Sequence, residues 1–243
     1  MLDAFPPTEH ALTDPNGLLA VGGDLTPQRL LHAYSRGIFP WYEPGEPILW
    51  WTPNPRAVLF PECFHRSRSL KKLIRSDTWS VAFDHDFEGV IDACAELTPE
   101  RLETWISDEM KAAYLQLHQL GFAHSVEIYV EGELAGGLYG VFLGRVFFGE
   151  SMFSRWSNAS KLALHTLCEI GASGGLDMID CQLPNDHLNS LGMQLIQRAD
   201  FESILKESIT VVDINDDQVI RSDATALSSL DKKLLDTSLA LGK

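Results

Sequence analysis

The sequence VEIYVEGELAGGLYGVFLGRVFF, at residues 126–148, contains three apolar runs that are separated by two glycine-containing turns. The runs are residues 126–130, 134–141 and 145–148, and the turns are Glu131-Gly132 and Leu143-Gly144. Runs of this composition, joined by short turns, predict an antiparallel meander of three strands. Gly136 and Gly137, inside the middle run, predict a β-bulge or another segment packed closely against the backbone.

The segments on either side of the meander predict helices and further strands. The helices are expected at residues 87–95, 108–120 (ended by Gly121), 159–170 (Asn158 as N-cap, Gly171 past the end) and 186–191, and the strands at residues 80–83 and 178–182. A meander followed by a helix and another strand resembles the GNAT-like (acetyltransferase-like) fold. The sequence therefore predicts an α+β fold of this kind.

The first sixty residues are rich in proline, glycine and tryptophan, a composition that excludes long helices and strands. One helix is expected, with Thr26 as its N-cap, Pro27 at its first position and Gly37 after its end. The pair Trp50-Trp51 would be a hydrophobic anchor between two domains.

The change in composition near Pro55 predicts two domains. Residues 1–57 would form a small loop-rich N-terminal domain, and residues 58–243 a larger GNAT-like domain. Within the larger domain, the acidic residues from about 207 to 243 predict a loosely packed tail.

The net charge limits the classes of partner. The 243 residues include 19 Lys and Arg against 34 Asp and Glu, which gives a formal charge of −15. So negative a charge counts against nucleic-acid binding except at a local basic patch, and we expect no DNA partner. The four cysteines show no metal-ligand spacing, so we expect reduced thiols and no metal. Residues 1–7 show no basic segment followed by an apolar one, and the sequence contains no 18-residue apolar run, so we expect a cytoplasmic protein that does not enter a membrane.

A basic run, FHRSRSLKKLIR at residues 64–75, stands out against this acidic background and contains no acidic residue. Such a run is either a solvated helix face or a site for an anion such as an RNA backbone. A second candidate is Arg155, close to a helix N-terminus where free N–H groups suit an anion. The candidate cations are Arg66, Arg68, Lys71, Lys72, Arg75 and Arg155.

Three polar side chains fall where the pattern predicts the ends of buried strands. Glu150 comes directly after the last meander strand, and Asp180 and Gln182 flank Cys181. Because strand side chains alternate, Asp180 and Gln182 would share a face, where the carboxylate could orient the amide. Each residue alone could instead tie down a neighbouring loop. Together they predict a site.

The segment from Ser154 to Ser160 indicates whether the protein could bind coenzyme A. Acyl-CoA enzymes of the GNAT fold bind pyrophosphate with a glycine-rich loop, [RQ]-x-x-G-x-[GA]. Here the corresponding positions after Arg155 hold Asn158 and Ser160. An enzyme that uses acyl-CoA is therefore the weaker interpretation, and we expect no cofactor.

Several further motifs together resemble those of the leucyl/phenylalanyl-tRNA–protein transferases, in the same order and from about Phe5 to about Phe201. They are Pro15-Asn-Gly-Leu-Leu-Ala20, Gly22-Gly-Asp-Leu25, Tyr34-Ser-Arg-Gly-Ile-Phe-Pro-Trp41, Ile48-Leu-Trp-Trp-Thr-Pro53, Thr104-Trp-Ile106, His124-Ser-Val-Glu127, Gly149-Glu-Ser-Met-Phe-Ser-Arg155 and Asp180-Cys-Gln182. The resemblance implies an enzyme that moves Leu, Phe or Met from leucyl-, phenylalanyl- or methionyl-tRNA to proteins with an N-terminal Arg or Lys. The extended proteins are thereby marked for degradation by the N-degron pathway.

The resemblance also implies roles for particular residues. The catalytic positions would be Glu150, Asp180 and Gln182, with Asn185 beside them; the pocket for the aminoacyl-adenosine would contain Trp41, Trp105, Tyr114, Leu138, Phe147, Leu167 and Ile179. Gln182 would orient the attacking amine, and Glu150 would either take a proton or hold the cationic end of the acceptor. Leu167 stands where the family has an aromatic residue, and Gly171 follows one turn later, so we expect a pocket that accepts Phe as well as Leu.

Two other classes of function remain open on the sequence alone. One is a GNAT-fold acyltransferase that uses acyl-CoA, and the other is a protein that binds tRNA without catalysis.

Overall fold

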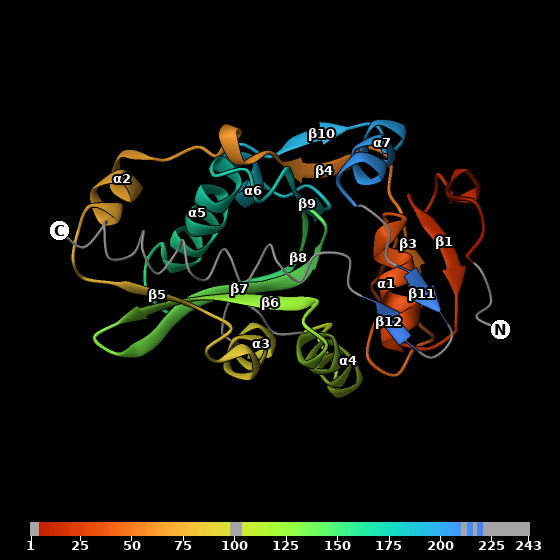
Figure 1. Cartoon of the computed structure of the whole chain (residues 1–243), viewed down its shortest axis with the longest axis horizontal. Helices are drawn as coiled ribbons and strands as arrows, with labels where there is room; N and C mark the ends of the chain where they lie inside the picture. Colours follow the sequence, from red (N-terminus) through yellow and green to blue (C-terminus); the bar gives the residue numbers. More distant parts are fainter. Residues whose placement is uncertain (1–4, 98–103, 210–212, 216–217, 221–243) are drawn as a thin grey trace.

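The computed structural model describes residues 5–97, 104–209, 213–215 and 218–220. Its main feature is a seven-stranded sheet in the order β10-β4-β9-β8-β7-β6-β5. The strands are β4 (Arg56–Leu59), β5 (Ser80–Phe83), β6 (Ala123–Val130), β7 (Glu133–Leu143), β8 (Val146–Ser154), β9 (Met178–Gln182) and β10 (Gln194–Ile196). Only β8 and β9 pair in parallel, and the other neighbours are antiparallel. The predicted α+β class is therefore confirmed (Figure 1).

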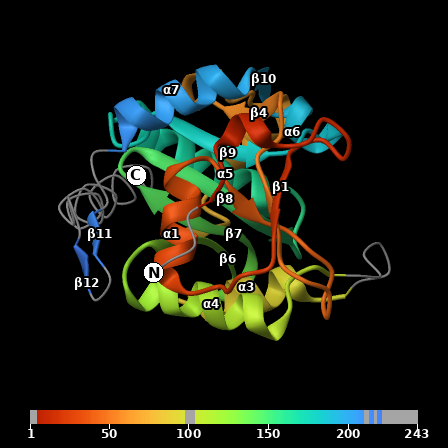
Figure 2. The ribbon, with the colours of Figure 1, turned by 90° about the vertical axis from the view of Figure 1, so that its right-hand side faces the viewer.

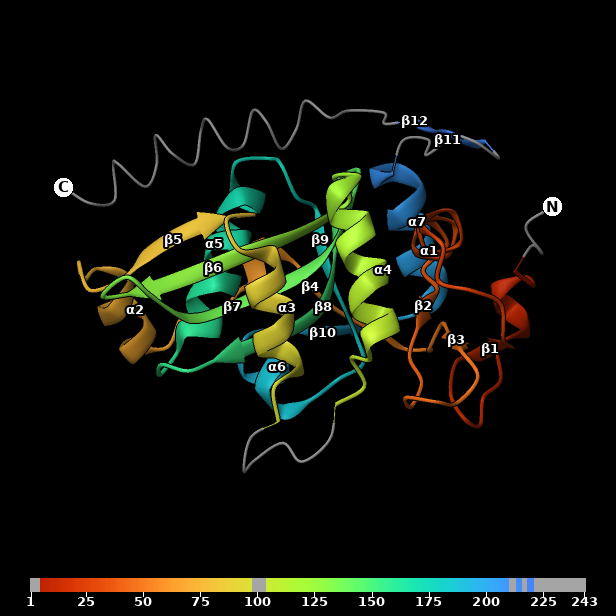
Figure 3. The same cartoon turned by 90° about the horizontal axis from the view of Figure 1, so that it is seen from below.

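Helices cover both faces of this sheet (Figures 1 and 3). On one face lie α3 (Phe87–Ala95) and α4 (Asp108–Gln119), and on the other lies α5 (Ala159–Ala172) with α2 (Arg68–Ile74) beside it. The remaining elements of the larger part are η2 (Pro61–Cys63), α6 (Asp186–Ser190), α7 (Arg198–Ser208), β11 (Asp213–Asn215) and β12 (Gln218–Ile220). No helix among the described residues is long and apolar enough to cross a membrane.

The N-terminal segment forms a second, three-stranded sheet with one helix. Its elements are η1 (Thr8–His10), β1 (Leu18–Val21), α1 (Pro27–Ser35), β2 (Phe39–Pro40) and β3 (Leu49–Trp51), with sheet order β1-β3-β2. The side chain of Thr26 caps α1, as predicted. The chain then enters the large sheet at β4.

The two parts share one hydrophobic core. Leu30, Leu31 and Trp50 of the N-terminal segment pack in the same cluster as side chains of α3, α4, α7 and the large sheet. Figure 2 shows α1 lying between α7 and α4. Trp50 is buried and its Nε1 donates to the Gly22 carbonyl at 2.8 Å, so this side chain fastens the N-terminal segment internally as well.

The meander is confirmed, and its strands are longer than predicted. A β-bulge lies next to Ile128, where the pairing of β6 with β7 shifts. The glycine pair also allows a close approach, because a Cβ on Gly136 would lie 2.4 Å from the Cβ of Ala159 in α5. The predicted β-bulge and the predicted close packing at the glycine pair are thus both confirmed.

Four details of the sequence prediction are wrong. Glu150 does not follow the strand but lies inside β8, which continues to Ser154. Helix α5 includes Gly171, because its missing side chain makes room for Pro61. Asn158 has a left-handed backbone (φ 67°) and makes no capping bond, while Ser154 Oγ accepts from the N–H of Ser160 instead. Residues 207 and 208 belong to α7; most of the predicted tail lies outside the described residues.

Candidate active site

A cavity of about 450 Å³ opens beside β8 and β9. Its lining residues come from β2 and the loop after it, from the segment before α4, from β7, β8, β9 and α5, and from α6 with the segment that leads into it. They are Phe39, Pro40, Trp41, Trp105, Leu138, Phe147, Gly149, Glu150, Ser151, Met152, Leu164, Ile179, Asp180, Cys181, Gln182, Leu183, Asn185 and Leu188. All four predicted catalytic residues line this cavity.

The cavity lies where the two parallel strands part. The recorded pairing of β8 with β9 ends at Phe148 and Asp180. Just beyond that point, each strand contains one extra residue relative to its antiparallel partner: Glu150 in β8 against β7, and Cys181 in β9 against β4. Such bulges redirect side chains and interrupt pairing. The local backbone therefore brings Glu150 and Gln182 to the same opening, although neither follows regular strand alternation.

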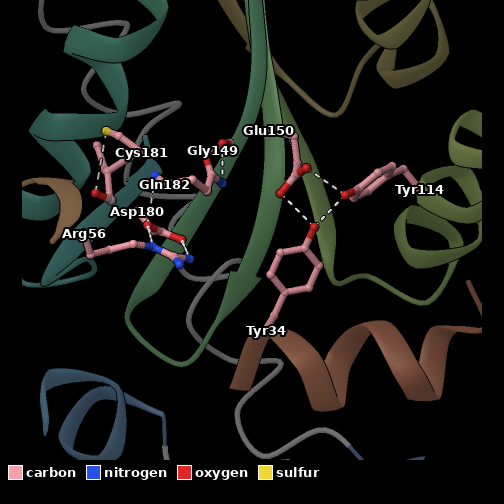
Figure 4. A network of polar contacts seen from close by, with 9 residues as sticks. Tyr34, Arg56, Tyr114, Gly149, Glu150, Asp180, Cys181 and Gln182 are labelled. Carbon is pink, nitrogen blue, oxygen red and sulfur yellow. Dashed lines mark hydrogen bonds and ion pairs between the residues drawn. The ribbon is translucent and has the colours of Figure 1, made fainter. Parts of the chain in front are cut away.

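Glu150 is held by two tyrosines from different helices (Figure 4). Tyr34 of α1 donates to Oε1 and Tyr114 of α4 donates to Oε2, each at 2.7 Å. The two tyrosine oxygens are themselves only 2.5 Å apart. Burial raises the pKa of Glu150 to about 7, although the two hydroxyl donors favour the charged form. Burial also raises the pKa of both tyrosines well above their ordinary value.

Asp180 forms a buried ion pair with Arg56 of β4. Arg56 Nε and Nη2 donate to the two carboxylate oxygens at 2.8 and 2.7 Å, and both side chains are almost completely buried. The guanidinium lies 4.8 Å from the ring centre of Phe39 and 4.6 Å from that of Phe201. Asp180 thus links β4, β9, α7 and the N-terminal segment, and its charge is already balanced.

Gln182 has a left-handed backbone (φ 56°). Its backbone N–H donates to Asp180 Oδ1 at 3.0 Å, which stabilises this turn, and its side-chain Nε2 donates to the Gly149 carbonyl at 2.8 Å. The second bond bridges the opening between β8 and β9. This bond fixes the orientation of the Gln182 carboxamide. The carboxamide oxygen has no hydrogen-bond partner within the described part of the chain.

The predicted relay between Asp180 and the side chain of Gln182 is therefore wrong in its contacts. The carboxylate holds the backbone of Gln182, and a main-chain carbonyl holds its amide. Asn185 lines the cavity as predicted, and its Oδ1 accepts from the N–H of Leu188 to cap α6. This bond fixes the segment between β9 and α6, which forms part of the cavity lining.

Five of the predicted pocket residues line the cavity, namely Trp41, Trp105, Leu138, Phe147 and Ile179. Tyr114 does not; it is fully buried and acts on the cavity through Glu150. Leu167 is also buried in the core, and Leu164, one turn earlier in α5, lines the cavity in its place. The extra room expected at Gly171 is absent, because Pro61 fills it.

The basic run contains helix α2, which Ser67 caps, and four cations of the run line a groove that we call the basic groove. These four are Arg68, Lys71, Lys72 and Arg75, all of them exposed. Two other candidates are paired with acids: Arg66 with Glu169, and Arg155 with Glu96 at 2.8 Å. The basic groove and α1 lie toward opposite ends of the long axis (Figures 1 and 3).

Three functional residues were missed by sequence reasoning. Arg56 stands in an otherwise apolar run, and a charge in such a strand requires a buried partner, which is a signal that could have identified its pairing with an acid. Tyr34 lies on the buried face of α1 like an ordinary core residue, and only its contact with Glu150 reveals its role. Leu164 lies one turn before Leu167 on the same side of α5, and only the packing shows which of the two lines the cavity.

Two family models match the chain. Residues 58–206 match the model described as "Leucyl/phenylalanyl-tRNA protein transferase", and residues 23–54 match the model of that family's N-terminal domain. Proteins named leucyl/phenylalanyl-tRNA–protein transferase are 60% identical in Pseudomonas entomophila (81% of this chain, 87% of that protein) and 58% identical in Pseudomonas putida strain W619 (83% and 89%). Among solved structures, a ribosomal-protein-alanine N-acetyltransferase from Brucella melitensis is similar at 15% identity, with a TM-score of 0.34 over 59% of this chain and 99% of that one.

Proposed function

Because the chain belongs to the leucyl/phenylalanyl-tRNA protein transferase family, we propose that it moves leucine, phenylalanine or methionine from tRNA to proteins that begin with arginine or lysine. The enzyme is an aminoacyltransferase, and its two substrates are an aminoacyl-tRNA and a protein. The bond formed is a peptide bond to the acceptor's α-amino group, and the extended N-terminus marks the acceptor for degradation by the N-degron pathway.

The observation that carries this proposal is the division of the cavity into an apolar part and a polar edge. Leu138, Phe147 and Ile179 supply apolar walls for the transferred side chain, while Trp41 and Trp105 supply flat surfaces for the terminal adenosine. Glu150 and Gln182 stand together at the opening of the strands. The ester carbon can therefore lie between an apolar site for its side chain and polar groups for the amine.

Little chemical assistance is needed once the two substrates are held together. An aminoacyl ester is already activated, and an α-amino group with a pKa near 7.7–8.0 is roughly a tenth neutral at pH 7. Placing amine and ester carbon together in a site with little water supplies most of the rate. The carboxamide oxygen of Gln182 would accept one amine hydrogen and orient the nitrogen.

Glu150 is the better of the two lining carboxylates for exchanging a proton with the amine. Asp180 already has a guanidinium on both its oxygens, whereas Glu150 has only neutral tyrosine partners. Its pKa of about 7 lies close to that of the amine, which is the match that efficient proton transfer requires.

A direct test mixes the protein with leucyl-tRNA and a peptide that begins with arginine, and measures the leucyl-peptide by mass spectrometry. The same peptide with a blocked α-amino group is the control. Transfer from leucyl-tRNA to the free peptide only would support the proposal. Tight binding of CoA with acylation from acyl-CoA would instead favour a GNAT acyltransferase, and tRNA binding without any product would favour a protein that only binds tRNA.

Side-chain selection should follow from the shape of the apolar part. We expect leucine and phenylalanine, both unbranched at Cβ, to be transferred at similar rates. Isoleucine should be transferred tens- to hundreds-fold more slowly, because its branched Cβ requires more width where the side chain enters the apolar part. Shape alone discriminates by about 1–3 kcal/mol, so isoleucine should not be rejected completely. Competition among tRNAs charged with the three amino acids for one peptide measures the ratios. Equal transfer of isoleucine and leucine would contradict this account of the pocket.

The basic groove is the proposed site for the tRNA backbone. Replacing Lys72 with glutamate should weaken tRNA binding and make the log–log dependence of the binding constant on salt shallower by about one unit, as expected for one lost phosphate contact. Lys206→Glu is the matched control, because Lys206 is an exposed lysine of α7 and the substitution changes the net charge equally. Equal effects of the two variants would move the tRNA site away from α2.

A further inference from the structure

Three side chains, Tyr34, Tyr114 and Glu150, form a closed ring of polar contacts at the edge of the cavity (Figure 4). The Tyr34 hydroxyl lies 2.5 Å from that of Tyr114, and the two hydroxyls lie 2.7 Å from Oε1 and Oε2 of Glu150. All three separations are within the range of O–H···O hydrogen bonds. Three such bonds require three hydrogen atoms.

The hydrogen count depends on the charge of Glu150. Each tyrosine supplies one hydrogen, and both keep it, since burial raises the pKa of each well above its ordinary value. If Glu150 is ionised, both hydroxyls donate to its carboxylate and no hydrogen remains for the contact between the tyrosines. If Glu150 is protonated, its hydroxyl donates to one tyrosine, that tyrosine donates to the other, and the second donates back to the free carboxyl oxygen.

We propose that Tyr34 and Tyr114 are positioning residues for Glu150: both donate to its carboxylate when it is ionised, and a ring of three hydrogen bonds closes each time Glu150 takes up a proton. The ring stabilises the protonated product of proton transfer, and buried chains of hydrogen bonds polarise one another. Only the identity of the proton donor, the acceptor's α-ammonium group, rests on the proposed function.

The proton balance of the transfer is then complete. Ionised Glu150 takes one proton from the α-ammonium group, the ring closes, and a neutral amine is left. The nitrogen forms a bond to the ester carbonyl carbon, and the bond from that carbon to the ribose oxygen breaks. The ribose oxygen leaves with the second nitrogen proton, and Glu150 returns its proton to water.

The other charged and titratable groups around Glu150 do not supply the missing hydrogen. Asp180 of β9 raises the pKa of Glu150 and Arg56 of β4 lowers it, and these two are bonded to each other. Tyr139 of β7 packs edge-on against Tyr114, with ring centres 5.5 Å apart, but its hydroxyl has no hydrogen-bond partner among the described residues. Tyr139 is therefore a natural control.

The test measures the coupling between the two tyrosines at two pH values. Thermal unfolding of the full chain is followed for Tyr34→Phe, Tyr114→Phe and the double variant at pH 5.5 and pH 8.5. At pH 5.5 the ring is closed, so the Tm of the double variant should fall by about 2–4 °C less than the sum of the falls in the two single variants. At pH 8.5 this non-additivity should disappear, because the shared hydrogen is gone.

The same tyrosine substitutions are then measured in a protein that carries Glu150→Gln. A carboxamide donates one N–H and accepts at its oxygen, so it imitates the protonated acid and should keep the coupling at both pH values. The control pair, Tyr114→Phe with Tyr139→Phe, should show the same coupling at pH 5.5 and pH 8.5. A tyrosine coupling in the wild type that does not change with pH would overturn the ring, since a merely structural contact behaves in that way.

A second measurement does not depend on how well the variants fold. Infrared spectra of the wild type should show the carbonyl band of a protonated carboxyl group at pH 5.5, lost with a midpoint near pH 7 and absent from Glu150→Gln. Absence of the band from the wild type would also overturn the inference. Neither measurement uses tRNA, so a failed ring leaves aminoacyl transfer measurable, and failed transfer leaves the ring intact.

Discussion

Replacing Asp180 with alanine should lower the free energy of unfolding by about 3–5 kcal/mol. The substitution leaves the guanidinium of Arg56 buried without its carboxylate, and breaking one partner of a buried pair typically has a cost of this size. Denaturant unfolding measures the loss. Transfer by the remaining folded enzyme should fall at least tenfold, because the turn at Gln182 loses the oxygen that accepts from its backbone N–H.

A double variant separates the unpaired charge from other effects. Arg56→Met together with Asp180→Leu removes both charges and retains similar volume, and such replacements are often neutral or stabilising. We expect this variant to recover most of the stability that either single substitution loses. A loss below about 1 kcal/mol in Asp180→Ala would mean that water or rearranged neighbours satisfy the guanidinium.

Replacing Glu150 with glutamine should slow aminoacyl transfer by about 10²–10⁴-fold, the usual range for loss of one positioned proton acceptor. Binding of charged tRNA should change far less, because glutamine preserves the shape and the tyrosine contacts. Single-turnover transfer at saturating tRNA gives the rate, and a separate binding titration gives the affinity. A rate within threefold of the wild type would remove Glu150 from proton transfer.

The pH dependence of stability shows whether Glu150→Gln is correctly folded. The pKa of Glu150 is raised from 4.5 to about 7, so the folded state binds more protons between these values. Wild-type stability therefore falls as pH rises through this window, whereas Glu150→Gln should lack this contribution. The variant should thus be at least as stable as the wild type at pH 8. Wild-type transfer should increase as pH rises through about 7, and the variant should lose that step.

Much of the fold could be predicted because local signals agreed with the final packing. The limits of α3 and β9 match the prediction, since α3 has an acid that caps it and β9 is a short apolar run. The glycine pair in the meander was informative because only glycine permits Ala159 to approach so closely. Strand ends were less predictable, since the pattern of β8 continues past Glu150 with polar and apolar residues mixed.

The geometry of the site was less accessible from the sequence. The bulges at Glu150 and Cys181 depend on how neighbouring strands pair, and no residue type at either position requires them. Tyr114 and Leu167 were assigned to the cavity because their chemistry suits it. Whether an apolar or aromatic side chain lines a cavity or lies behind it depends on a rotation of the helix that sequence patterns do not resolve.

The apolar core that α1 shares with α3, α4 and α7 must remain incomplete while the ribosome is still making the chain. Tyr34 precedes Glu150 by 116 residues, and Thr8, which donates to Glu202, precedes it by 194. At synthesis rates of about 5–20 residues per second, the first of these contacts is delayed by roughly 6–23 s. During that time Leu30, Leu31 and Trp50 lack the part of their final packing that later segments of the chain supply. The segment made first is therefore among the last to reach its final packing, and its apolar side chains are the ones a chaperone would meet on the nascent chain.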